Sequence, residues 1–231
     1  MLRQISNFWL RNIYPRLAPL IATIGIVGLA SCLLILFCLA QLAEEVLERD
    51  AFTFDTTFLL WLHQFANPNL DNLMLFITNL GNPNTVIVVA GITLLLLSWR
   101  RYREEAKFFV LACLGALILN TGLKLFFYKP RPELWDRLIT EKSFSFPSGH
   151  ALGSMVLYGF IAYELATHYP NFAKVIYSLA VILIVAIGIS RLYLGVHWPT
   201  DIIAGYGVGF LWLMICITML KLQKLRQKNF N

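Results

Sequence analysis

The sequence predicts an all-α, polytopic membrane protein with six transmembrane helices. Of its 231 residues, 58% are hydrophobic and only 14% are charged, and the mean hydropathy is +0.66. A soluble domain carries about 25% charged residues, so the composition indicates that lipid surrounds much of the chain. Apolar runs of about the 20 residues that a bilayer span needs occur at about 17–42, 83–99, 108–127, 148–167, 175–195 and 201–220.

We expect these runs to be helices. Inside a bilayer the backbone must pair its own polar groups, and a helix does this within one segment. Strands of a membrane barrel would alternate apolar and polar residues, and none of the six runs shows that alternation.

The first run, 17–42, follows Arg3, Arg11 and Arg16, as the core of a signal peptide would. It is much longer than the core of a signal peptide, which has about 7–15 apolar residues. We therefore expect a retained transmembrane helix here.

The other runs differ in how polar their ends are. The runs at 83–99 and 175–195 are clear, with the sequences "IVVAGITLLLLSW" and "VIYSLAVILIVAIGIS". The run at 108–127 ends beside a basic cluster, and those at 148–167 and 201–220 begin with polar residues. Polar groups therefore gather at the ends of several predicted helices.

Lys and Arg concentrate in alternate connections between the runs. Most of them lie before residue 17, at 100–107, at 174 and after residue 220. Cytoplasmic loops carry such an excess, so both termini are predicted to be cytoplasmic. The connection at 43–82 is acidic, as expected outside. Because the basic residues form no continuous face, nucleic acid is not an expected partner.

The outer connection at 43–82 is the longest. Phe58, Trp61, Leu62 and Phe65 recur in it at helical spacing. They predict either a capping helix packed on the spans or an interfacial helix that lies in the headgroup layer.

Three polar clusters fall at the predicted outer face. They are "KLFFYKPRP" at 124–132, "PSGH" at 147–150 and "SRLYLGVHWPTD" at 190–201. Charged residues in or beside spans are costly, so they indicate function. Three segments distant in sequence are thus expected to meet at one membrane surface.

The clusters suit an anion with several oxygens. Arginine binds phosphate oxygens in pairs, and lysine adds a compact charge. Pro147 at a first helical position would leave the next three amides near a helix start, which is an anion site, and Gly149 would let the anion approach. Prolines on both sides of Arg131 restrict its backbone and favour an extended arm toward the pocket.

The two histidines suggest a reaction. His197 and Asp201 are four residues apart, so the carboxylate can fix one ring nitrogen and leave the other as a nucleophile for phosphorus. His150 is the candidate acid for the leaving alcohol and then the base for water. The clusters contain no group of carboxylates for magnesium, so we expect neither a metal nor another cofactor.

Taken singly, several basic residues have simpler interpretations. Lys124 and Arg191 could extend to the lipid headgroups. Lys129, Arg137 and Lys142 are interpreted as solvated charges of the outer loops or as headgroup contacts.

Together, the motifs Lys-x6-Arg-Pro, Pro-Ser-Gly-His and Ser-Arg-x5-His-x3-Asp resemble the three signatures of the type-2 phosphatidic acid phosphatase family, with no departure at a motif position. The resemblance implies one membrane-embedded phosphatase domain over 1–231, with its motif region at 124–201 and the outer loop at 43–82. By the same resemblance, the catalytic residues are His150, His197 and Asp201, and the phosphate-binding residues are Lys124, Arg131, Ser148, Gly149 and Arg191.

The resemblance also implies a function, namely a phosphoric monoester hydrolase that acts on membrane lipids without metal. We expect phosphatidate-type lipid phosphates as substrates, in a bacterial cytoplasmic membrane. Undecaprenyl diphosphate and phosphatidylglycerol phosphate are the alternatives within the family. Outside it, the alternatives are an enzyme like the vanadium haloperoxidases, whose vanadate takes the phosphate position, and a non-catalytic lipid-binding protein.

Overall fold

A computed structural model of the chain describes residues 14–47 and 53–230, and over these residues the protein is all-α. Arg3 and Arg11, which entered the orientation argument, and the charged residues at 48–50 lie outside the described residues. The helices are α2 (Tyr14–Leu47), α3 (Thr53–His63), α4 (Pro68–Asn79), α5 (Pro83–Trp99), α6 (Arg103–Phe127), α7 (Gly149–His168), the 3-10 turn η2 (Pro170–Phe172), α8 (Ala173–Tyr193) and α9 (Pro199–Phe230).

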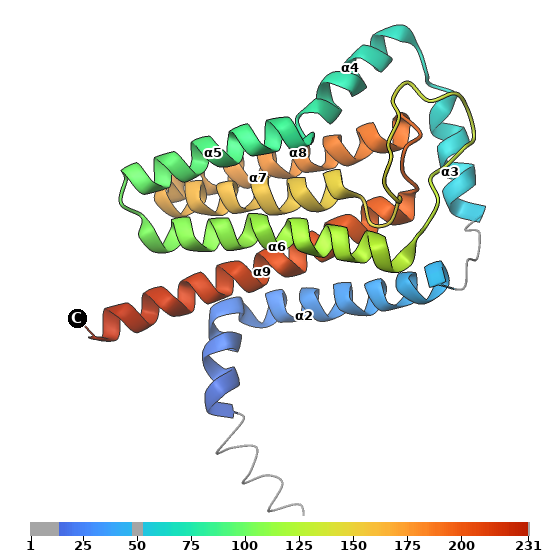
Figure 1. Cartoon of the computed structure of the whole chain (residues 1–231). Coiled ribbons are helices and arrows are strands. Elements are labelled where there is room, and N and C mark those ends of the chain that lie inside the picture. The colour runs from blue at the N-terminus through green and yellow to red at the C-terminus, as the bar shows by residue number, and fades with distance from the viewer. Residues whose placement is uncertain (1–13, 48–52, 231) are drawn as a thin grey trace, which may run out of the picture.

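Six of these helices run lengthwise through the molecule. They are α2, α5, α6, α7, α8 and α9, and they match the six apolar runs (Figure 1). At Gly25, with φ +78°, α2 is kinked, and its first turns point away from the bundle, whereas the last turns of α9 lie at one end of it (Figure 1). Helices α3 and α4 and the connection 128–148 lie at the other, which we call the α3–α4 end (Figure 1).

Length and composition identify fewer membrane spans than the six expected. Among the described residues, four segments are long and apolar enough: Val27–Leu47, Arg103–Phe127, Pro170–Tyr193 and Pro199–Lys228. Helices α4 and α5, bent by 44° at a short break, qualify together as a fifth.

Helix α7 is the expected span that does not qualify by length and composition. It carries Glu164 and two histidines. Because α7 packs against α6, α8 and α9, much of its surface, including Glu164, is buried in protein. Its polarity therefore reflects neighbouring helices rather than lipid.

The crossing of α7 and α9 positions the polar clusters. A Cβ atom on Gly205 would lie 2.7 Å from the carbonyl oxygen of Ser148, and one on Gly209 would lie 2.9 Å from that of Leu152. Glycines at these two positions therefore let the helix backbones approach closely, as in other membrane bundles. This approach brings the start of α7 against the start of α9.

The predicted helix of the outer connection forms as α3. Phe58 and Leu62 pack against the apolar cluster around Leu59, as in a capping helix. Trp61 and Phe65 lie elsewhere on α3 and beyond its end, and both remain about half exposed, at 51% each. The segment thus presents aromatic surface outward while it covers the α3–α4 end.

Candidate active site

His197 and Asp201 lie side by side at the α3–α4 end. Gly195, with φ +67°, turns the chain after α8, and α9 begins at Pro199. Nδ1 of His197 lies 3.2 Å from Oδ2 of Asp201, and Nε2 lies 3.2 Å from Nη1 of Arg131. Because a guanidinium only donates, Nε2 must be the acceptor and Nδ1 carries the proton. The lone pair of Nε2 therefore accepts this hydrogen bond from Arg131.

The surroundings of the His197 imidazole disfavour its charged form. Its side chain is only 2% exposed. Burial, and then the positive charges of Arg131, Arg191 and Lys124, hold the pKa of His197 well below its usual range. A neutral ring whose Nε2 carries no proton is the form that can act as a nucleophile.

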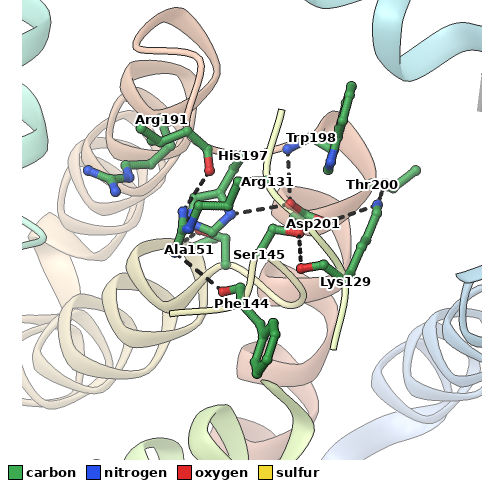
Figure 2. A network of polar contacts seen from close by, with 12 residues as sticks. Lys129, Arg131, Phe144, Ser145, Ala151, Arg191, His197, Trp198, Thr200 and Asp201 are labelled. Carbon is green, nitrogen blue, oxygen red and sulfur yellow. Dashed lines mark hydrogen bonds and ion pairs between the residues drawn. The ribbon is translucent and has the colours of Figure 1, made fainter. Parts of the chain in front are cut away.

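The carboxylate of Asp201 is held from three sides (Figure 2). Oδ2 also accepts a hydrogen bond of 2.9 Å from the amide of Trp198, and Oδ1 lies 3.0 Å from Nζ of Lys129. The side chain of Lys129 is only 14% exposed. The interpretation of Lys129 as a solvated loop charge was therefore wrong, because its ammonium group is paired with the buried carboxylate of Asp201.

A second carboxylate, that of Asp55, completes this network. Its two oxygens accept hydrogen bonds from the amide of Thr200, at 3.0 Å, and from the Thr200 hydroxyl, at 2.6 Å. Oδ2 of Asp55 lies 3.7 Å from Nζ of Lys129. Helix α3 therefore ties the first turn of α9 in place through a residue that no motif marked.

Arg131 is fixed by the backbone around it. Nη1 donates to the carbonyl oxygen of Val196 at 2.6 Å, and Nε donates to that of Ser143 at 2.8 Å. Lys124 donates to the carbonyl oxygen of Phe144. These contacts hold two cations beside His197 without placing a carboxylate on either.

The "PSGH" segment differs in detail from the expectation. The N-cap of α7 is Ser148 and its first residue is Gly149, so Pro147 precedes the cap instead of starting the helix. The amide of Ser148 donates to the carbonyl oxygen of Asp201 at 3.0 Å, and Ser148 is fully buried. Within the described part of the chain, the amides of Gly149 and His150 have no acceptor, as is usual at a helix start.

A cavity of about 460 Å³, which we call the first cavity, is lined by several of the predicted site residues. Its polar end is lined by Lys124, Arg131, Gly149, His150 and His197. Its remaining walls are mostly apolar side chains of α5, α6 and α7. Ile87, Leu114 and Leu117 line this part and are largely exposed, so the cavity opens sideways between α5 and α6.

Arg191 does not line this first cavity. It lines a second cavity of about 410 Å³, where Nη1 donates to Oγ1 of Thr78 at 2.8 Å and Nη2 is paired with Glu141. Of the eight predicted site residues, five therefore share one cavity. Of the other three, Asp201 contacts the Nδ1 side of the His197 ring, Ser148 caps the start of α7, and Arg191 is paired with Glu141.

Metal ligands do not gather in this structure. Across residues 14–47 and 53–230, no group of three or more His, Cys, Asp or Glu side chains could hold a metal ion.

Comparisons with known proteins agree with the motifs. The family model of the PAP2 superfamily matches residues 105–224. Phosphatidylglycerophosphatase B of Bacillus subtilis (strain 168) is 36% identical over 152 residues, which cover 62% of this chain and 72% of that protein. An undecaprenyl-diphosphatase of Sulfolobus acidocaldarius is 33% identical over 145 residues, covering 61% and 66% respectively.

A solved structure shares the fold. The crystal structure of the first transmembrane PAP2 type phosphatidylglycerolphosphate phosphatase from Bacillus subtilis superposes with a TM-score of 0.73 at 27% identity. The match covers 82% of this chain and 95% of that one.

Proposed function

Because the chain belongs to the PAP2 superfamily, and is thus a multi-pass membrane lipid phosphate phosphatase, we propose that it hydrolyses phosphatidylglycerophosphate. The relative and the solved structure of highest similarity described above are both named for that activity. Undecaprenyl diphosphate is the second candidate, because the Sulfolobus relative is named for it. Both candidates are better supported than the phosphatidate-type lipids expected from the sequence.

The observation that carries the chemistry is that Nε2 of His197 lies against Arg131 and that both line one cavity with Lys124. Nε2 of His197 attacks phosphorus, the bond from phosphorus to the lipid oxygen breaks, and His150 gives that oxygen its proton. Asp201 accepts the Nδ1 proton in a hydrogen bond and stabilises the ring as it becomes positive. The two cations, with the amides of Gly149 and His150, stabilise charge on the equatorial oxygens.

The second half of the reaction restores the enzyme. Water attacks the phosphohistidine, the bond from phosphorus to nitrogen breaks, and His150 takes the proton from the water. Inorganic phosphate leaves. Because cations of the chain stabilise the transferred group, we propose that the reaction needs no metal.

The proposed orientation places the reaction at the outer face. Helices α2, α5, α6, α7, α8 and α9 would each span the bilayer, with α7 shielded from lipid by its neighbours. All three motifs lie at the α3–α4 end, opposite the last turns of α9 (Figure 1). With basic connections at the other end, both termini would be cytoplasmic, in a bacterial cytoplasmic membrane.

A panel of lipid phosphates tests the proposal. Purified protein would be given phosphatidylglycerophosphate, undecaprenyl diphosphate and phosphatidate in mixed micelles, with and without a chelator. We expect the highest kcat/KM for phosphatidylglycerophosphate, unchanged by the chelator and lost in His197→Ala. His168→Ala, at the far end of α7, is the matched control and should stay active.

Each part of this experiment has an outcome that would contradict the proposal. Phosphate release by His197→Ala at the wild-type rate would exclude the phosphohistidine route. A higher kcat/KM for undecaprenyl diphosphate would transfer the assignment to the second candidate. Activity lost in chelator and restored by magnesium would contradict metal independence.

A further inference from the structure

Two cavities meet at a thin partition at the α3–α4 end. The first holds His197 and the lateral apolar opening, and the second holds Arg191. Asn82, Pro83 and Glu141 line both. The partition therefore consists largely of the side chains of Glu141 and Asn82.

Both polar side chains of the partition hold functional groups. Glu141 is paired with Arg191, and Oδ1 of Asn82 lies 2.8 Å from Nε2 of His150. Arg191 is only 1% exposed, and its Nε has no hydrogen-bond partner among the described residues. A buried guanidinium that lines a cavity and has an unused donor has capacity for a further acceptor.

The second cavity reaches the surface at the α3–α4 end. Its outer lining includes Asn79, Asn84 and Thr140, which are all exposed. Its inner end is Arg191. It thus leads from water to the partition without crossing the apolar part of the first cavity.

The proposed reaction needs such a passage. After the first step the lipid product still fills the apolar part of the first cavity, which opens toward lipid. Water must nevertheless reach the phosphohistidine, and inorganic phosphate, a multiply charged anion, must leave. A path through apolar side chains would strip phosphate of its hydration at high cost.

We propose that the second cavity is the passage for water and inorganic phosphate, and that Glu141 and Asn82 form its gate. The inference rests on the proposed phosphatase function. A phosphate oxygen and the Glu141 carboxylate are both anionic acceptors for Arg191, so they compete for it. When phosphate takes Arg191, Glu141 is released and the partition opens. When Glu141 returns, it displaces phosphate toward the surface.

Narrowing the mouth of the passage tests the route. Asn84→Trp adds bulk at an exposed position that lines only the second cavity. Asn69→Trp, on the exposed surface of α4 and in neither cavity, is the matched control. Single-turnover reactions with excess enzyme would follow the dephosphorylated lipid by rapid quench and free phosphate with a phosphate-binding reporter.

We expect Asn84→Trp to form the dephosphorylated lipid at the wild-type rate but to release phosphate about tenfold more slowly, a barrier change of about 1.4 kcal/mol. Asn69→Trp should match the wild type in both steps. Phosphate release at the wild-type rate in Asn84→Trp would overturn the route, and so would slower formation of the dephosphorylated lipid. If the wild type forms no dephosphorylated lipid, the phosphatase proposal itself fails.

Glu141→Gln tests the gate separately. The carboxamide competes poorly for Arg191, so inorganic phosphate should inhibit this variant at severalfold lower concentration than the wild type. Glu141→Asp keeps the charge and should fall between the two. Glu133→Gln is the control, because Glu133 is 84% exposed and, among the residues that the structure describes, is paired only with Arg137, at 3.7 Å. An unchanged or weaker phosphate inhibition in Glu141→Gln would overturn the competition.

Discussion

The ammonium group of Lys129 lies 3.0 Å from the carboxylate of Asp201, on the side opposite His197 (Figure 2). The same ammonium lies 3.7 Å from Asp55. One largely covered cation thus lies between two buried carboxylates, and one of these contacts His197, the proposed nucleophile. The charge on the carboxylate that contacts His197 is therefore balanced by Lys129, although Lys129 does not line the first cavity.

Replacing Lys129 should harm both stability and turnover. In Lys129→Met the carboxylates of Asp55 and Asp201 would remain buried without their cation. Removing one partner of a buried pair costs about 3–5 kcal/mol, so the thermal midpoint in detergent should fall clearly. Lys142→Met, at an exposed position, is the control and should melt like the wild type.

A second substitution separates charge balance from packing. Burial raises the pKa of Asp55, and hydrogen bonding from Thr200 and the charge of Lys129 lower it. Asp55→Asn removes one of the two unbalanced charges, so the double variant Asp55→Asn/Lys129→Met should be more stable than Lys129→Met alone. A double variant that melts lower than both single variants would show that packing, not charge, dominates at this site.

Asp201→Asn should slow turnover while leaving substrate binding nearly intact. Asp201 contacts His197 and the Trp198 amide through one oxygen and does not line the first cavity. An amide cannot support the positive imidazole and presents a donor where an acceptor is needed, so kcat should fall by about 100-fold. The measurement is steady-state kinetics, and a rise in KM with normal kcat would move Asp201 from orientation to binding.

The depressed pKa of His197 makes stability depend on pH. Below about pH 6.5 the unfolded chain binds a proton at this ring and the folded protein does not. Since the unfolded state binds more protons there, the free energy of unfolding decreases as pH falls, by at most about 1.4 kcal/mol per pH unit for this one group. Above pH 6.5 both states are neutral at His197 and the contribution is constant.

Thermal melting of wild type and His197→Gln between pH 5 and pH 8 checks this dependence. The variant lacks the titrating ring, so its midpoint should fall less on acidification. Parallel curves for the two proteins would show that His197 titrates alike in both states.

The sequence predicted the parts of the site that lie within contiguous motifs. His197 and Asp201 are one helical turn apart, so their contact follows from local spacing. That the three clusters share one end follows from counting apolar runs, because successive spans alternate direction. The limits of α2, α5, α6, α7 and α8 were also close, since apolar runs end where helices leave the bundle, whereas α9 continues to Phe230, well beyond the run at 201–220.

The remaining residues could not be found in this way because their contacts are not local. Asp55 and Thr200 are 145 residues apart, and Glu141 and Arg191 are 50 apart. A lone acid in a loop gives no signal of its partner. The polarity of α7 likewise has a tertiary cause, because Glu164 faces neighbouring helices. Pro147 was expected at the first helical position but lies two positions earlier, since Ser148 supplies a side-chain cap and Gly149 begins the helix.

Gly153 offers a direct test of where the lipid chain lies. It lines the first cavity, and a Cβ atom added to it would meet nothing within 4 Å. Gly153→Leu should therefore fill the apolar part without disturbing α7, since leucine favours a helix more than glycine does. If that part holds the lipid chain, kcat/KM for long-chain substrates should fall by about tenfold or more. Hydrolysis of a short water-soluble phosphate ester should continue.

Gly91→Leu is the matched control, because Gly91 also has open space around it but lies outside the cavity. Equal losses for long and short substrates in Gly153→Leu would mean that the substitution distorts the catalytic end, and unchanged kinetics for both would place the lipid chain elsewhere.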